Sequence, residues 1–124
     1  MTLSHPFPDV VRIEPAGICN FRCTHCPVGR EGGAGIILSY DNFVRFFEAL
    51  PLVPRVLVLY HGGEPLLNPR LNDMLTFAKN KGCRHTILNT NASLLALEGY
   101  AGLDEMRVSF DGASAEENDK IRTN

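Results

Sequence analysis

Runs of apolar residues alternate along the chain with stretches in which apolar positions recur at helical spacing. Four short runs rich in apolar residues have the character of strands, and they occupy residues 10–13, 56–60, 86–89 and 106–110. The run at 56–60 is continuously apolar, as is typical of a parallel strand covered on both faces. The alternation predicts repeated β–α units, and hence an α/β fold built on a parallel sheet.

The stretches between and after these runs predict helices. They cover residues 40–50, 69–81, 93–99 and 115–121. Ser39 is the expected N-cap of the first helix, which Pro51 ends. Asn68 is expected to cap the second helix, with Pro69 at its first position and Gly82 in a left-handed conformation after its last turn.

Polar or glycine-containing segments lie at the end of each predicted strand. Cysteines follow the first strand, Gly-Gly-Glu-Pro follows the second, Asn-Thr-Asn closes the third, and Asp-Gly follows the fourth. Ligands of parallel β–α folds bind at the carboxyl ends of the strands, both in open sheets and in barrels. Segments far apart in the sequence are therefore predicted to converge on one site.

Three of the four cysteines are closely spaced, as Cys19-x3-Cys23-x2-Cys26. The start of the chain lacks a basic stretch followed by an apolar core, so no secretory signal is predicted. Cytosolic thiols stay reduced, which favours metal binding or catalysis over disulfides. Iron–sulfur clusters are normally held by four cysteines. Three ligands leave one iron open, and an open position distinguishes a catalytic metal from a structural one.

Two other interpretations of these cysteines stay open: a zinc site with His61 as fourth ligand, and inert thiols. Cys83 is not expected to complete a cluster, because it precedes the third strand while the site follows the strands. A strand of six residues separates its two ends by roughly 20 Å. Cys83 is instead predicted to be a small buried hydrophobe.

Composition limits the possible function classes. The chain has 124 residues, enough for one domain, with 44% hydrophobic and 21% charged residues. The formal net charge of −2 and the scattered Lys and Arg residues do not indicate a nucleic-acid partner. No apolar run approaches the roughly 18–20 residues needed to cross a bilayer, so we expect a cytoplasmic protein without a membrane partner.

Four segments together resemble the radical S-adenosylmethionine (SAM) superfamily. The segment from Cys19 to Cys26 resembles its cluster-binding loop, and Gly62-Gly63-Glu64-Pro65 resembles the motif that holds the amino group of SAM. Residues 89–91 and 109–112 are similar to the third- and fourth-strand segments of the branch that matures cofactors and modifies peptides. Ala92 stands where that branch usually has glycine.

The resemblance implies a fold and an activity. Residues 1–124 would form the first four units of a partial (βα)6 TIM-like barrel, as one incomplete radical SAM core domain whose C-terminal units are missing. The family binds a [4Fe–4S] cluster and SAM, and reductively cleaves SAM to a 5′-deoxyadenosyl radical. The implied partners are a low-potential electron donor of the flavodoxin or ferredoxin type and an unknown substrate. The alternatives are a non-catalytic iron–sulfur electron-transfer module and a structural Cys3His zinc domain.

The resemblance also implies roles for single residues. Cys19, Cys23 and Cys26 would be the metal ligands. Gly62 and Gly63 would let the backbone approach the methionyl amino group. Glu64 would accept from the same ammonium, or cap the turn that follows it.

Four further residues are implied in cofactor binding. His25 occupies a position near adenine. Asn89 would contact SAM or substrate, or satisfy backbone groups at the strand end. Ser109 would reach the ribose or carboxylate of SAM, and Asp111 would contact SAM or serve an Asp-Gly turn.

Overall fold

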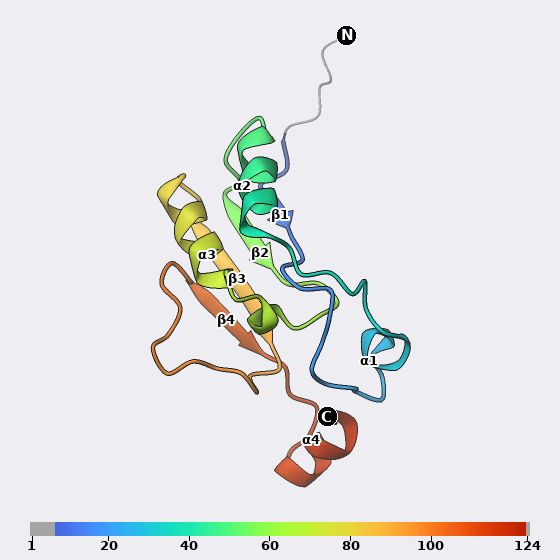
Figure 1. Cartoon of the computed structure of the whole chain (residues 1–124). Coiled ribbons are helices and arrows are strands. Elements are labelled where there is room, and N and C mark those ends of the chain that lie inside the picture. The colour runs from blue at the N-terminus through green and yellow to red at the C-terminus, as the bar shows by residue number, and fades with distance from the viewer. Residues whose placement is uncertain (1–6, 124) are drawn as a thin grey trace.

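A computed structural model describes residues 7–123 of the chain. Its elements in order are β1 (Val10–Arg12), α1 (Pro27–Glu31), α2 (Tyr40–Ala49), β2 (Val56–Leu59), the 3-10 helix η1 (Pro65–Leu67), α3 (Leu71–Asn80), β3 (His85–Thr90), β4 (Glu105–Val108) and α4 (Ala115–Ile121), as Figure 1 shows. The four strands form one parallel sheet in the order β1-β2-β3-β4. The predicted α/β class is therefore confirmed. The expectation about a secretory signal falls largely on residues 1–6, which lie outside the described residues.

The hydrophobic core lies between the sheet and two helices, α2 and α3, which pack side by side on one of its faces (Figure 1). Its buried members come from both helices, from β2 and β3, and from the segment between α3 and β3: Phe43, Phe47, Leu57, Leu59, Leu71, Met74, Leu75, Ala78, Cys83 and Leu88. The short helices α1 and α4 lie beyond the carboxyl ends of the strands (Figure 1). The core therefore sits at one end of the molecule, away from the segments predicted to carry function.

Helix α2 follows the prediction. The Ser39 side chain accepts a hydrogen bond from the Asn42 backbone N–H at 3.2 Å and so caps the first turn. Phe43 and Phe47, one turn apart, are buried, and both meet the Phe77 ring of α3 in edge-to-face geometry. These contacts fix α2 against α3.

Helix α3 begins two residues later than predicted, at Leu71 instead of Pro69. Asn68 is buried, and its side-chain Nδ2 donates to the carbonyls of Pro15 and Leu38 at 2.8 and 2.9 Å. Its Oδ1 accepts from the Arg70 N–H. Asn68 thus joins three segments of the chain as well as turning the backbone into α3. At the other end of the helix Gly82 has φ +104°, as predicted.

The helix predicted at 93–99 is wrong, because the segment forms turns. Ala92 has φ +64°, a left-handed conformation that breaks a helix before it starts. The Asn91 side chain accepts from the Ser93 N–H at 3.0 Å, which is a local alternative to helical hydrogen bonding. Leu94 and Leu95 are 42% and 45% exposed, so no apolar surface draws this segment into a helix.

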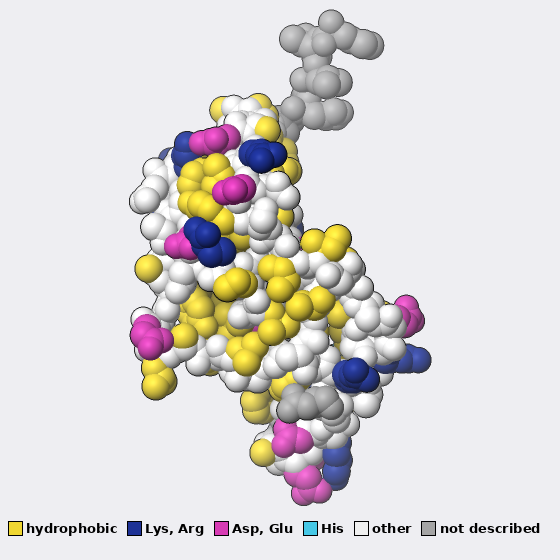
Figure 2. Space-filling view, in the orientation of Figure 1, with side chains coloured by type: hydrophobic (Ala, Val, Ile, Leu, Met, Phe, Trp, Pro, Cys, Tyr) yellow, Lys and Arg dark blue, Asp and Glu magenta, His cyan; other side chains and the backbone are white. Residues whose placement is uncertain are grey.

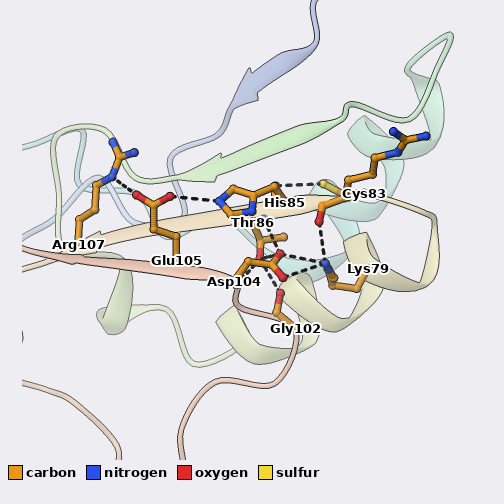
Figure 3. Close-up of polar contacts among 9 residues, drawn as sticks. Lys79, Cys83, His85, Thr86, Gly102, Asp104, Glu105 and Arg107 are labelled. Carbon is orange, nitrogen blue, oxygen red and sulfur yellow. Dashed lines mark hydrogen bonds and ion pairs between the residues drawn. The ribbon is translucent and has the colours of Figure 1, made fainter.

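A polar network joins the start of β4 to the amino end of β3 and to the carboxyl end of α3 (Figure 3). The Lys79 ammonium donates to both carboxylate oxygens of Asp104, which in turn accepts from the backbone N–H and hydroxyl of Thr86. His85 and Arg107 both lie against the Glu105 carboxylate, with a His85 contact of 3.1 Å. This network lies at the end of the sheet opposite the cysteines, so it supports the fold and not the site.

The surface shown in Figure 2 carries Lys and Arg side chains spread among acidic ones, not gathered into one patch. Among the described residues, no helix has both the length and the apolar character required to span a membrane.

Candidate functional site

The carboxyl ends of the strands surround a cavity of about 160 Å³. Residues at or beyond the carboxyl ends of all four strands line it: Cys19, Phe21, Cys23, His25, Cys26, His61, Gly62, Gly63, Glu64, Asn89, Thr90, Asn91, Ser109 and Arg122. The predicted convergence of segments is therefore seen in the structure. Of the residues predicted from the sequence, Asp111 alone is absent from this lining.

The cysteine loop is held in place by backbone hydrogen bonds to the end of α4. The N–H groups of Arg22 and Thr24 donate to the carbonyls of Thr123 and Ile121, at 2.5 and 2.9 Å. Cys26 stands at the N-cap position of α1, with its N–H bonded to the Cys23 carbonyl at 3.1 Å. A loop without strands of its own is thus ordered by a helix that lies about a hundred residues further along the chain.

The three loop cysteines and Cys83 are all free thiols. Burial raises the pKa of the Cys23 thiol above its ordinary value; the positive charge of Arg122 opposes this rise, and Cys19 and Cys26 add to it. Cys83 is buried at the amino end of β3, where its sulfur contacts the carbonyls of Arg55 and His85. The prediction that Cys83 is a buried hydrophobe away from the site is confirmed.

Gly62 and Gly63 approach other parts of the chain closely. Both N–H groups donate to one carboxylate oxygen of Glu14, at 2.8 and 3.1 Å. A Cβ on Gly63 would overlap the carbonyl oxygens of Ala16 and Ile18, so only glycine fits there. The loop after β2, which contains Gly62 and Gly63, therefore packs closely against the start of the cysteine loop.

Glu14 was missed by the sequence analysis. It lies two residues after the end of β1, at the same edge of the sheet as the other segments, and this position was the signal that could have identified it. Its carboxylate joins the end of β1 to the loop after β2.

Glu64 is only 2% exposed, and three groups of the chain donate to its carboxylate. The Leu66 N–H donates at 3.1 Å, the Thr90 hydroxyl at 2.6 Å and the Asn91 N–H at 2.8 Å. The turn-capping role is present, and the same carboxylate ties β2 to the end of β3. A carboxylate has about four acceptor positions, which leaves one for an external donor.

Asn89 and Ser109 lie beside each other at the ends of β3 and β4. The Asn89 amide donates to the Ser109 hydroxyl at 3.1 Å, and the Ser109 N–H donates to the Thr90 carbonyl at 2.9 Å. Both side chains line the cavity, and their polar atoms are partly accessible there.

Asp111 does not line the cavity, but it contacts two residues that do. One of its carboxylate oxygens is 3.6 Å from His25 Nε2 and 2.6 Å from Arg122 Nε. The Arg122 contact lacks hydrogen-bond alignment and is therefore an ion pair. Gly112 packs tightly against the start of α4, where a Cβ would overlap the Asn118 nitrogen. The Asp-Gly dipeptide thus lies in the segment that leads into α4.

Arg122 is the second residue that the sequence analysis missed. Its side chain is 14% exposed and places a positive charge beside the three cysteines. No local pattern marks it, because an arginine at the end of a polar helix is ordinarily solvated.

The donor set of the cavity fits an iron–sulfur cluster. Within residues 7–123, no three His, Cys, Asp or Glu side chains stand close enough together to hold a single metal ion. The three thiols of one loop are the ligand type of iron–sulfur clusters, and a four-iron cluster is wider than one ion. Its ligands therefore stand further apart than those of zinc.

Comparisons with known proteins agree with this arrangement. The family model of the radical SAM superfamily matches residues 13–124. The AdoMet-dependent heme synthase of Methanosarcina barkeri is 30% identical over 93% of this chain, and a probable GTP 3′,8-cyclase of Saccharolobus islandicus is 32% identical over 94%. The alignments cover 34% and 39% of those relatives, so the chain spans little more than a third of their length. Their names specify different products and substrates.

The crystal structure of BtrN in complex with AdoMet and 2-DOIA has a TM-score of 0.75 and 20% identity to this chain. The match covers 89% of this chain and 48% of that one. This likeness shows the fold, and it confirms an α/β arrangement that forms part of a TIM-like barrel. Members of the family are enzymes that use a [4Fe–4S] cluster and SAM. With the family model matching most of its length, this chain belongs to the radical SAM superfamily.

Proposed function

We propose that this chain binds a [4Fe–4S] cluster through Cys19, Cys23 and Cys26, binds SAM beside it, and takes part in the reductive cleavage of SAM. One observation carries the proposal. The three free thiols share a cavity with the Gly62–Gly63 loop and with the polar ends of β3 and β4. When bound, a cluster with an open iron supplies the electron that converts SAM to methionine and a 5′-deoxyadenosyl radical.

The chain's own contribution is to hold the ligands and SAM in fixed positions. The cysteine loop is bonded to the end of α4 on one side, and on the other the Glu64 N–H donates to the Ile18 carbonyl at 2.8 Å. Ligands held this way lose little freedom when a cluster binds, which favours binding.

The Gly62 carbonyl is our candidate acceptor for the amino group of SAM. The Gly63 N–H points to Glu14, and the N–H and C=O of a trans peptide point in opposite directions. The Gly62 carbonyl therefore faces away from Glu14. Glu64 keeps about one free acceptor position for the same ammonium group.

The other side chains of the cavity suit the remaining groups of SAM. We assign Asn89 and Ser109 to its hydroxyl or carboxylate oxygens and His25 to the neighbourhood of adenine. Arg122 offsets negative charge in the cavity, and Asp111 keeps Arg122 and His25 in position. The reductant is a low-potential electron donor of the flavodoxin or ferredoxin type.

Anaerobic reconstitution with iron and sulfide tests the proposal. After reduction, the electron paramagnetic resonance spectrum is recorded with and without SAM, and 5′-deoxyadenosine is assayed. We expect a [4Fe–4S]⁺ signal that changes when SAM is added. Ser substitutions of Cys19, Cys23 or Cys26 abolish the signal, whereas Cys83→Ser, a buried cysteine away from the cavity, retains it.

Two results would contradict the proposal. A colourless protein that binds one zinc per chain would identify a structural zinc domain. A cluster whose signal is indifferent to SAM would identify an electron-transfer module.

A further inference from the structure

The side-chain amide of Asn91, directly after β3, forms a closed ring of hydrogen bonds with the cysteine loop. Asn91 Nδ2 donates to Asn20 Oδ1 at 3.0 Å, Asn20 Nδ2 donates to Ser93 Oγ at 2.8 Å, and Ser93 Oγ donates to Asn91 Oδ1 at 2.7 Å. Every amide and hydroxyl group of the ring thus finds a partner of the right kind.

The orientation of the Asn91 amide is fixed by a group that cannot reverse its role. The backbone N–H of Ser93 only donates, and it lies 3.0 Å from Asn91 Oδ1. The opposite atom of the amide, Nδ2, must therefore face the cysteine loop. There it also lies 3.9 Å from Cys19 Sγ, within reach of a hydrogen bond to sulfur.

The backbone of Asn91 is held as firmly as its side chain. Its N–H donates at 2.8 Å to the buried Glu64 carboxylate. The Cys19 sulfur receives a second donor, the Phe21 N–H, at 3.4 Å. A donor from the residue after β3 and a donor from the loop itself thus point at one of the three candidate cluster ligands.

We propose that Asn91 sets the reduction potential of the cluster by donating a hydrogen bond to Cys19, an inference that rests on the proposed function. Reduction adds negative charge to a cluster and its thiolates. An N–H donor to a ligand sulfur stabilises the reduced form more than the oxidised form, and so raises the potential. Asn91 is thus a positioning residue, which also couples the end of β3 to the loop that carries the ligand.

The test is a redox titration of the reconstituted protein, without SAM and without oxygen, followed by electron paramagnetic resonance. Asn91→Leu removes the donor but keeps the branched shape of the side chain, and Asn72→Leu, on the exposed surface of α3, is the matched control. We expect Asn91→Leu to keep its iron and sulfide content and to titrate at a more negative midpoint potential. The control titrates with the wild type.

Asn91→Ala is the second variant. It removes the same donor without the added bulk of leucine, so we expect a shift in the same direction. If Asn91→Leu fails to retain a cluster, an unchanged potential in Asn91→Ala would overturn the inference.

The possible failures are distinguishable. A wild-type protein that forms no cluster would overturn the proposed function together with this inference. A wild-type cluster that responds to SAM, with the same potential in Asn91→Leu, would overturn this inference alone.

Discussion

Replacing Glu64 by glutamine tests whether its buried carboxylate holds the site together. The carboxylate accepts from the Leu66 N–H, the Thr90 hydroxyl and the Asn91 N–H, and it is 2% exposed. Glutamine has the same shape but presents an NH₂ group in place of one oxygen. Whichever way that amide is turned, it faces either the Leu66 or the Asn91 N–H, and two donors then oppose each other.

The expected cost follows from this geometry. A hydrogen bond to a charged acceptor contributes about 1.5–3 kcal/mol, and a buried donor left unpaired costs about 1–3 kcal/mol. We therefore expect Glu64→Gln to lower the free energy of unfolding by about 2 kcal/mol. Urea denaturation followed by circular dichroism measures this, and the midpoint should fall by roughly 1 M.

Glu98→Gln is the matched control, because Glu98 lies exposed in the loop between β3 and β4. Its free energy of unfolding should stay within about 0.5 kcal/mol of the wild type, as is usual for surface substitutions. If Glu64→Gln were as stable as this control, the carboxylate would not tie β2 to β3, and the reasoning would be refuted.

Three further predictions concern other parts of the site and the fold. Glu14→Ala leaves the N–H groups of Gly62 and Gly63 without their acceptor, so SAM titrations should show an affinity for SAM reduced by about tenfold or more. Glu14→Gln keeps an acceptor oxygen and should keep most of that affinity. Hydrogen bonds, chiefly from Lys79, hold the pKa of Asp104 below its ordinary value of 3.8. The stability that this carboxylate contributes is fully present above pH 3.8 and is lost as the pH falls through the lower pKa of the folded state. Urea denaturation at about pH 7 and pH 3 should therefore show that the wild type and Asp104→Asn differ less in free energy of unfolding at the lower pH. Ala92→Gly should raise the free energy of unfolding by about 0.5–1 kcal/mol by relieving the left-handed backbone, and the same measurement on Ala96→Gly should show no gain.

The parts of the fold that could be predicted are those that local pattern determines. Leu57, Leu59 and Leu88 belong to short apolar runs because their strands are buried, and such runs are visible in the sequence. Parallel strands then place the segments that follow them at one edge. That rule predicts that the cysteines lie together with residues 62–64, Asn89 and Ser109, as the cavity lining shows.

The parts that were missed depend on contacts between distant residues. Glu14 meets the Gly62 N–H across 48 positions of sequence, and Arg122 reaches the cysteine loop from the end of α4. Arg122 stands in no pattern that differs from an ordinary solvated charge, and Glu14 is marked only by its position after β1. The helix predicted at 93–99 failed for a related reason: its leucines have helical spacing, but the Asn91 side chain and the Ala92 backbone favour a turn.

The polar residues that shape the cavity fall into two groups with different expected behaviour. Glu14, Glu64 and Asn91 bond mainly to other parts of the chain, and each joins the end of one strand to the segment after another. Cys19 and Cys26 are partly exposed and make few such bonds. Substitutions of the first group should therefore change stability and SAM binding together, because they disturb the frame. Substitutions of these two cysteines should remove cluster binding while leaving the fold of the apoprotein nearly unchanged. This difference between the two groups follows from their burial and hydrogen bonding alone. It is expected of a site that is formed before the cluster binds, and not of a loop that folds around its metal.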